Sequence, residues 1–228
     1  MSDSAKPNPL IEILITLIIP SAILMKMSGD ESLGAVNALL LALSFPLFWG
    51  VREFIVRRKL NLFAALGLVS ILLTGGIGLL QLDTQWLAIK EAAIPGLIGV
   101  AVLVSAHTRY PLVQVLLYTP ALMNVELIQR SLDERGNRQA FENSLKNATH
   151  MLGGSFFFSS VMNYFLATWI VTSPSGSAAF NEELGRLTLM SYPVIAVPSM
   201  LIMMAIMYYL TRAIRTLAGL KLTEAIKQ

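Results

Sequence analysis

Six long apolar windows, separated by short charged stretches, constrain this chain more than any other feature. To within a few residues they span positions 9–25, 33–51, 60–81, 86–106, 151–171 and 187–210. Each is close to the roughly 20 residues that a helix needs to cross the hydrocarbon core of a bilayer. The windows are apolar all round, which favours helices, because a helix satisfies its own backbone hydrogen bonds in lipid. They predict an all-α, polytopic transmembrane helix bundle with about six membrane helices.

The composition supports a membrane location. Hydrophobic residues make up 55% of the 228 residues and charged residues only 14%, and the mean hydropathy is +0.65. One soluble core could not enclose so large an apolar fraction. We therefore expect membrane lipids to surround most of the helices.

Lys and Arg are distributed unevenly between alternate loops. If the six windows cross the membrane in turn, 14 of the 17 basic residues lie on one side, and only Lys26, Lys90 and Arg186 lie on the other. Positively charged short loops tend to stay in the cytoplasm, so both termini are predicted to be cytoplasmic. The cytoplasmic basic residues, which contribute to the net charge of +3, then face anionic lipid headgroups. No basic stretch with interleaved aromatic residues indicates nucleic-acid binding.

The predicted crossings divide the chain into five segments. They are a disordered tail (1–8), the first four membrane helices (9–112), an amphipathic helical connection in the cytoplasm (113–150), the last two membrane helices (151–212) and a cytoplasmic tail (213–228). The connection is expected to be helical because its apolar residues recur at helical spacing.

Side chains that would indicate an enzyme or a metal centre are scarce. The chain has no cysteine, which excludes disulfides and thiolate metal sites, and its two histidines, His107 and His150, lie at predicted helix ends. Hydrolytic triads, phosphate-binding loops and zinc motifs do not occur. We therefore predict a non-enzymatic protein without cofactors or bound metal.

Four polar residues inside the predicted membrane helices form a candidate intramembrane polar site: Glu12, Lys90, Glu91 and Asn163. Ionisable groups in membrane helices often mark ion, proton or substrate paths. Glu12 either reaches headgroup water or lines an internal cavity. Lys90 either extends outward or pairs inside the bundle with Glu91, Glu182 or Glu183. Asn163 should form hydrogen bonds within the bundle, because an unpaired amide in hydrocarbon is costly.

The third predicted helix carries small residues at steps of three or four: Ala64, Gly67, Ser70, Thr74 and Gly78. At this spacing they share one face of the helix. Small side chains let a neighbouring helix approach closely. The stripe is therefore interpreted as a packing surface rather than as a ligand site.

The connection before the fifth window contains an amphipathic pattern. Leu122, Val125, Ile128 and Leu132 recur at helical spacing, and Gly136 is expected to end that helix. Such a helix either lies on a surface or offers its apolar face to a cytoplasmic partner. These four residues are the candidate partner-binding residues.

Several short features occur in an order and at spacings that resemble the bacterial septation protein A family. They are Gly75-Gly76, Asp83-Thr84, Trp86, Lys90, Tyr110-Pro111-Leu112, Asn163 and Phe180-Asn181, and the resemblance covers about residues 60–189. It implies a bacterial inner-membrane protein that supports cell-envelope synthesis or division through interactions and without catalysis. Lys90 and Asn163 are the polar positions carried over first.

The chain departs from that family in its charges on the predicted outer side. Glu91 follows Lys90 where the family has Lys-Pro, and Glu182 and Glu183 stand where the family tends to have Lys. The membrane topology therefore transfers better than any ligand or partner.

Two functions of different classes remain open. The first is a non-enzymatic envelope protein whose partners are membrane lipids, a second copy of the chain or envelope-synthesis proteins. The alternative is a small transporter or channel for an ion, a proton or a lipid-linked intermediate, with its path lined by the candidate polar site. Convergence of those polar side chains on one cavity would favour transport.

Overall fold

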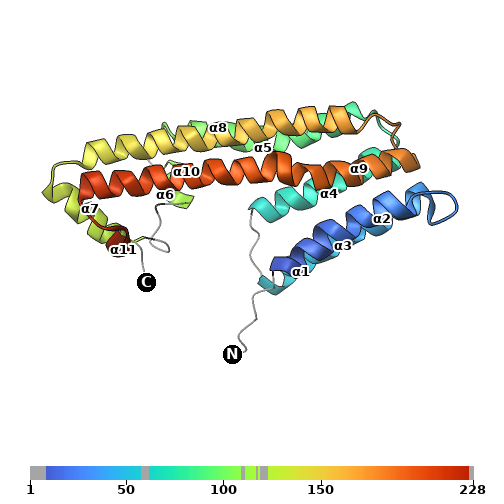
Figure 1. The fold of residues 1–228 in the computed structure, drawn as a ribbon, viewed down its shortest axis with the longest axis horizontal. Helices are drawn as coiled ribbons and strands as arrows, with labels where there is room; N and C mark the ends of the chain where they lie inside the picture. Colours follow the sequence, from blue (N-terminus) through green and yellow to red (C-terminus); the bar gives the residue numbers. More distant parts are fainter. Residues whose placement is uncertain (1–8, 58–61, 109–110, 117, 119–122, 226–228) are drawn as a thin grey trace. The chain divides into compact units, whose positions relative to one another are not determined.

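The computed structural model describes residues 9–57, 62–108, 111–116, 118 and 123–225, and these are helical almost throughout (Figure 1). The elements are α1 (Pro9–Ile13), η1 (Leu14–Ile18), α2 (Ile19–Met27), α3 (Gly34–Arg57), α4 (Leu62–Leu79), α5 (Gln85–Ser105), α6 (Leu112–Leu116), α7 (Val125–Glu134), α8 (Arg138–Ile170), α9 (Ala178–Ser191), η2 (Tyr192–Ala196), α10 (Val197–Ala213), η3 (Ile214–Ala218) and α11 (Leu222–Ala225). No strand occurs in these ranges, so the predicted all-α class is confirmed. The predicted tail at 1–8 lies outside the described residues.

Two of the three π-helical turns coincide with prolines. Pro20 follows η1 at the start of α2, and Pro193 lies within η2, just before Pro198 in α10. A proline inside a helix has no N–H to donate, and its ring clashes with the carbonyl one turn earlier. A wider π turn accommodates this clash locally while the helix continues.

Four helical stretches among the described residues are long and apolar enough to cross a membrane. They are Leu10–Met27, Gly34–Arg52, Gln85–Ser105 and Ala178–Ala218, and the apolar helix Ala65–Leu79 is shorter. These helices are those of an integral membrane protein. The fifth predicted window falls within α8 and is not among the four, since Ser155, Ser159 and Asn163 make it more polar. The number of six crossings therefore stays a prediction.

The predicted connection and the fifth predicted membrane helix are parts of one continuous helix. α8 runs without a break from Arg138 to Ile170 over 33 residues. The boundary predicted at residue 150 falls inside this helix, because no proline interrupts it and buried Thr149 and Leu152 continue its packed face.

The chain forms two compact units. Unit 1 comprises Met1–Ile94 and Met162–Ile195, and unit 2 comprises Pro95–Val161 and Ala196–Gln228. This division differs from the five predicted segments, because it follows contacts between distant parts of the chain instead of the order of the windows.

Unit 1 is built around α2, α3, α4 and α9. α2 packs against α3 and α9, and α3 also packs against α4; Figure 1 shows α2 and α3 as neighbours joined by a short turn. Phe180 and Asn181, in the first turn of α9, are both fully buried. The Asn181 Nδ2 donates to Ser28 Oγ at 3.1 Å and to the Ala35 carbonyl at 2.7 Å. This amide therefore ties α9 to the turn between α2 and α3.

Unit 2 has its own apolar core. Ile128 of α7, Phe141 and Leu145 of α8, and Leu210 of α10 are buried in it. The side-chain amide of Asn137, between α7 and α8, donates to the Leu217 carbonyl of η3 at 2.9 Å. The amphipathic segment after α6 is thus an integral part of this core.

Candidate functional site

A buried lysine marks the most unusual polar environment of unit 1. Lys90 lies in α5 and is only 7% exposed. Its Nζ lies 2.6 Å from Glu91 Oε1 and donates to Thr74 Oγ1 at 2.7 Å and to Ser70 Oγ at 3.2 Å. Of the two interpretations of Lys90, the structure shows the inward one, with Glu91 as its partner.

A tight turn sets the pairing between α4 and α5. α4 ends at Leu79 and α5 begins at Gln85, and the Asp83 carboxylate accepts the Gln85 backbone N–H at 2.8 Å. An Asp at this place satisfies one of the free N–H groups of the first helical turn. The turn therefore brings Lys90, early in α5, beside Ser70 and Thr74 of α4.

The small-residue stripe of α4 has two roles instead of one. Ser70 and Thr74 accept hydrogen bonds from Lys90. A Cβ on Gly78 would lie 2.6 Å from Leu39 Cδ2, whereas one on Gly67 would meet nothing within 4 Å. The interpretation as a packing surface is thus confirmed at Gly78, and at Ser70 and Thr74 the same face also supplies oxygen partners to a buried ammonium.

A cavity of about 350 Å³ opens beside this ion pair within unit 1. Its polar lining comes from seven elements and comprises Thr16, Ser21, Ser70, Thr74, Lys90, Glu91, Asn163, Thr188, Ser191 and Tyr192. Lys90, Glu91 and Asn163 of the candidate polar site therefore meet at one cavity. Glu12 does not line it, and its side chain is exposed at the start of the chain's first helical stretch.

The cavity offers more acceptors than free donors. The hydroxyls of Thr16, Thr188 and Ser191 donate to the backbone carbonyls one turn earlier in their own helices, at 2.7, 2.8 and 2.8 Å. Their remaining oxygen lone pairs can accept from a solute. Buried Ser21 Oγ has no hydrogen-bond partner in the described part of the chain, so its hydroxyl can serve a solute as donor or acceptor.

Sequence reasoning missed the hydroxyl residues of this cavity. Thr16 and Ser21 precede and follow Pro20, and Thr188 and Ser191 precede Pro193. Hydroxyl residues within about one turn of a proline in an apolar helix are a usable signal, because polar side chains in a membrane helix tend to face the protein interior or a cavity.

The other two acidic partners considered for Lys90 are engaged elsewhere. Glu182 pairs with Arg186 on the exposed side of α9. Glu183 accepts the backbone N–H groups of Thr172 and Ser173 at 3.0 and 2.9 Å, which fixes the loop before α9. Neither carboxylate therefore contributes to the cavity.

The predicted partner-binding face is largely covered by the chain itself. Ile128 and Leu132 are fully or almost fully buried in the core of unit 2, and Val125 packs against it. Leu122 lies outside the described residues. The prediction of an exposed apolar docking face is therefore wrong at Ile128 and Leu132, because the amphipathic pattern reflects packing within unit 2.

The two histidines lie side by side in unit 2. Their rings meet edge to face with centroids 5.9 Å apart, and the His150 ring nitrogen contacts the Lys146 carbonyl at 2.8 Å. No group of three or more potential metal-binding side chains occurs among the residues described.

Comparison with known proteins identifies no relative of this chain. No protein-family model, no curated protein and no solved structure matches the chain.

Proposed function

We propose that this chain is an integral membrane protein that carries a small anion together with a proton through the cavity around Lys90. The ion pair of Lys90 and Glu91, set among hydroxyl groups within apolar helices, is the observation that supports the proposal most directly. Ionisable side chains are rare inside membrane helices, and they commonly belong to ion, proton or substrate paths.

The ion pair couples the two cargoes through charge balance. With Glu91 ionised, its carboxylate neutralises the Lys90 ammonium. When Glu91 takes up a proton, the ammonium becomes available to an anion, which replaces the lost carboxylate charge. The site is neutral in both states, so neither leaves an unpaired charge in an apolar interior. Release of the proton restores the original pair and expels the anion.

The lining suits a small anion that needs few donors, because most of its hydroxyl groups already donate within their own helices. Lys90 supplies the charge, and the hydroxyl of buried Ser21, which has no hydrogen-bond partner among the described residues, can donate beside it. The surrounding wall includes apolar Leu39, Leu184 and Leu187. A low-dielectric wall strengthens the attraction between the ammonium and a bound anion.

Proteoliposomes test this function with chloride, acetate and phosphate as probes. An inward gradient of the transported anion should acidify the lumen, which an enclosed pH-sensitive dye reports. Lys90→Met should lower the initial rate of acidification at least about tenfold, since loss of one charge-assisted contact exceeds about 1.4 kcal/mol. Glu91→Gln should uncouple anion transport from proton transport, because the anion then binds without a proton.

Lys26→Met is the matched control, because Lys26 is an exposed cation outside the cavity. Its acidification rate should equal that of the unaltered chain. Equal rates in liposomes with and without protein for all three probes, or an unchanged rate in Lys90→Met, would rule out proton-coupled anion transport.

A second proposal follows from the resemblance to septation protein A. In it, the chain supports cell-envelope synthesis or division in the bacterial inner membrane through contacts with envelope-synthesis proteins or a second copy, with both termini cytoplasmic. It is favoured by Lys90 and Asn163, the two positions that the resemblance singles out, which line the same cavity.

Single-cysteine labelling tests the topology of this second proposal, and the absence of cysteine gives it a clean background. In intact cells, an impermeant maleimide should label Ala179→Cys and spare Glu126→Cys until the membrane is opened. Both positions are exposed helical sites. Equal labelling of both would exclude this topology. Crosslinking with mass spectrometry in native membranes should recover envelope-synthesis proteins, and their absence would count against the envelope role.

A further inference from the structure

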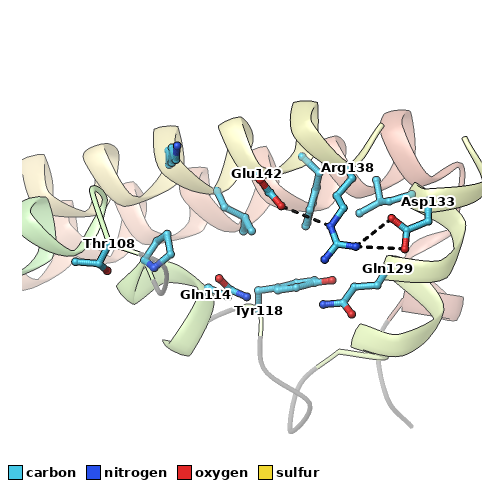
Figure 2. Close-up of a pocket in the computed structure, with 12 residues that line it drawn as sticks. Thr108, Gln114, Tyr118, Gln129, Asp133, Arg138 and Glu142 are labelled. Carbon is cyan, nitrogen blue, oxygen red and sulfur yellow. Dashed lines mark hydrogen bonds and ion pairs between the residues drawn. The ribbon is translucent and has the colours of Figure 1, made fainter. Parts of the chain in front are cut away.

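A second cavity, of about 400 Å³, lies wholly within unit 2 and is not used by the proposed transport. Its walls come from Thr108 after the end of α5, from α6 and Tyr118, and from α7 and α8 (Figure 2). The candidate membrane span Gln85–Ser105 ends three residues before Thr108 on this wall. By its place in the chain, the cavity therefore lies where an apolar span gives way to polar sequence.

A tyrosine hydroxyl in this cavity is buried without a hydrogen-bond partner among the described residues. Tyr118 is 5% exposed, and its ring packs edge to face on Phe141 with centroids 5.2 Å apart. Its Oη forms no hydrogen bond with any described residue. Figure 2 shows the hydroxyl end of Tyr118 on the side of Arg138 and Gln129. Since a buried hydroxyl without a partner is costly, this arrangement is suited to a ligand that accepts a hydrogen bond.

The hydroxyl is a donor at neutral pH. Burial raises the pKa of Tyr118 to about 12, although the nearby positive charge of Arg138 acts in the opposite direction. Tyr118 therefore keeps its proton at physiological pH and can donate it to an anionic oxygen.

The Tyr118 hydroxyl is surrounded by side chains of both charges, whose ion pairs a ligand can replace. Arg138 Nη1 lies 3.3 Å from Asp133 Oδ1, and Arg138 Nε lies 3.6 Å from Glu142 Oε1. The three side chains are 63%, 52% and 50% exposed, and exposed ion pairs of this kind contribute little stability. A ligand can therefore replace either carboxylate on Arg138 at small cost.

We propose that this cavity binds a zwitterion made of a phosphate and an ammonium group, as in the headgroup of phosphatidylethanolamine. The phosphate accepts hydrogen bonds from Tyr118 Oη and from the guanidinium of Arg138, which is well matched to phosphate oxygens. The phosphate displaces the carboxylates of Asp133 and Glu142 from Arg138. The ammonium group of the ligand then forms ion pairs with these two carboxylates. Lys146, two helical turns further along α8, also lines the cavity and adds a positive charge to it.

Charge balance decides between this ligand and its nearest alternatives. A purely anionic headgroup would leave Asp133 and Glu142 facing a negative ligand without a counter-charge. A choline headgroup has the charges but no N–H to donate to the two carboxylates. Of these three headgroups, the ammonium-bearing phosphate is the one that can pair with both carboxylates and accept from both donors.

Native mass spectrometry of the full chain in detergent tests this assignment. The protein is mixed with equal amounts of phosphatidylethanolamine, phosphatidylglycerol and phosphatidylcholine, and the bound lipids are counted. The unaltered chain should retain phosphatidylethanolamine severalfold over the other two. Tyr118→Phe should lower the affinity for phosphatidylethanolamine about tenfold, because a hydrogen bond to a charged group is worth at least about 1.4 kcal/mol. Asp133→Asn should lower the preference over phosphatidylglycerol.

Tyr208→Phe is the matched control, because Tyr208 is an exposed tyrosine of unit 2 outside the cavity, and its lipid preference should be unchanged. Thermal unfolding without lipid separates binding from folding: Tyr118→Phe should be as stable as the unaltered chain or more stable, because the lost hydroxyl forms no hydrogen bond with any described residue. Equal retention of the three lipids by the unaltered chain, or an unchanged preference in Tyr118→Phe, would overturn the proposal.

A competition experiment identifies the source of the zwitterion. Displacement of the lipid by millimolar phosphoethanolamine would support a soluble ligand with the same headgroup. Retention of the lipid under those conditions would support the membrane phospholipid itself.

Discussion

Replacing Glu91 by alanine is expected to lower the free energy of unfolding by about 3–5 kcal/mol, because it leaves the buried ammonium of Lys90 without a counter-charge. Lys90 is 7% exposed and would keep Ser70 and Thr74 as its hydrogen-bond acceptors, but neither carries a counter-charge. Unfolding in detergent, followed by heat or by titration with a denaturing detergent, measures the loss.

The double variant Lys90→Met/Glu91→Ala should be more stable than Glu91→Ala alone by about 2 kcal/mol or more, since an apolar side chain then replaces the stranded charge. Glu182→Ala serves as the control. Its ion pair with Arg186 has side chains 44% and 59% exposed, and exposed pairs contribute about 0–1 kcal/mol. A double variant less stable than Glu91→Ala would show that the Lys90 charge is satisfied without Glu91.

Gly185→Ala is expected to destabilise unit 1 by about 1–3 kcal/mol, the usual cost of overfilling a packed contact. A Cβ at Gly185 of α9 would lie 2.9 Å from the Ser21 backbone carbonyl and 2.7 Å from Met25 Cγ. The methionine side chain can move aside, but the carbonyl belongs to the backbone of α2. The two helices must therefore separate, and because α2 carries Ser21 of the cavity, transport should fall as well.

Gly67→Ala is the matched control, since a Cβ at Gly67 in α4 would meet nothing within 4 Å. Without a clash, alanine should stabilise this helix by up to about 1 kcal/mol through its higher helix propensity. If the two variants unfold alike, the close approach of α2 and α9 does not limit stability.

The helical elements of this chain were largely predictable from the sequence, because long apolar windows leave a helix as the stable form in lipid. The ends of the elements were less so. α8 continues across the predicted boundary at 150, and α9, η2 and α10 follow one another directly over Ala178–Ala213. The helix continues through Pro193 and Pro198, as the unbroken window at 187–210 predicted, but it begins at Ala178, a start that the polar residues of its first turns hid from a pattern of apolar residues.

The candidate site was partly predictable, because polar side chains are conspicuous in apolar helices. Lys90, Glu91 and Asn163 stood out as polar groups in apolar helices, and all three line the cavity. Glu12 stood out equally, yet its side chain is exposed. Ser70 and Thr74 did not stand out, because their small hydroxyls suit a packing surface as well as they suit an ammonium partner.

By itself, the sequence determined that this protein is all-helical and apolar enough for a membrane, and it identified which residues share a face of each helix. Those properties depend on local periodicity and composition. Only the tertiary structure decided that Lys90 turns inward to Ser70, Thr74 and Glu91, that Ile128 and Leu132 face a core, and that Tyr118 is buried without a hydrogen-bond partner in the part of the chain that the structure describes. Such pairings depend on how each helix is rotated and which distant helix it meets, and periodicity along one helix carries no information about either.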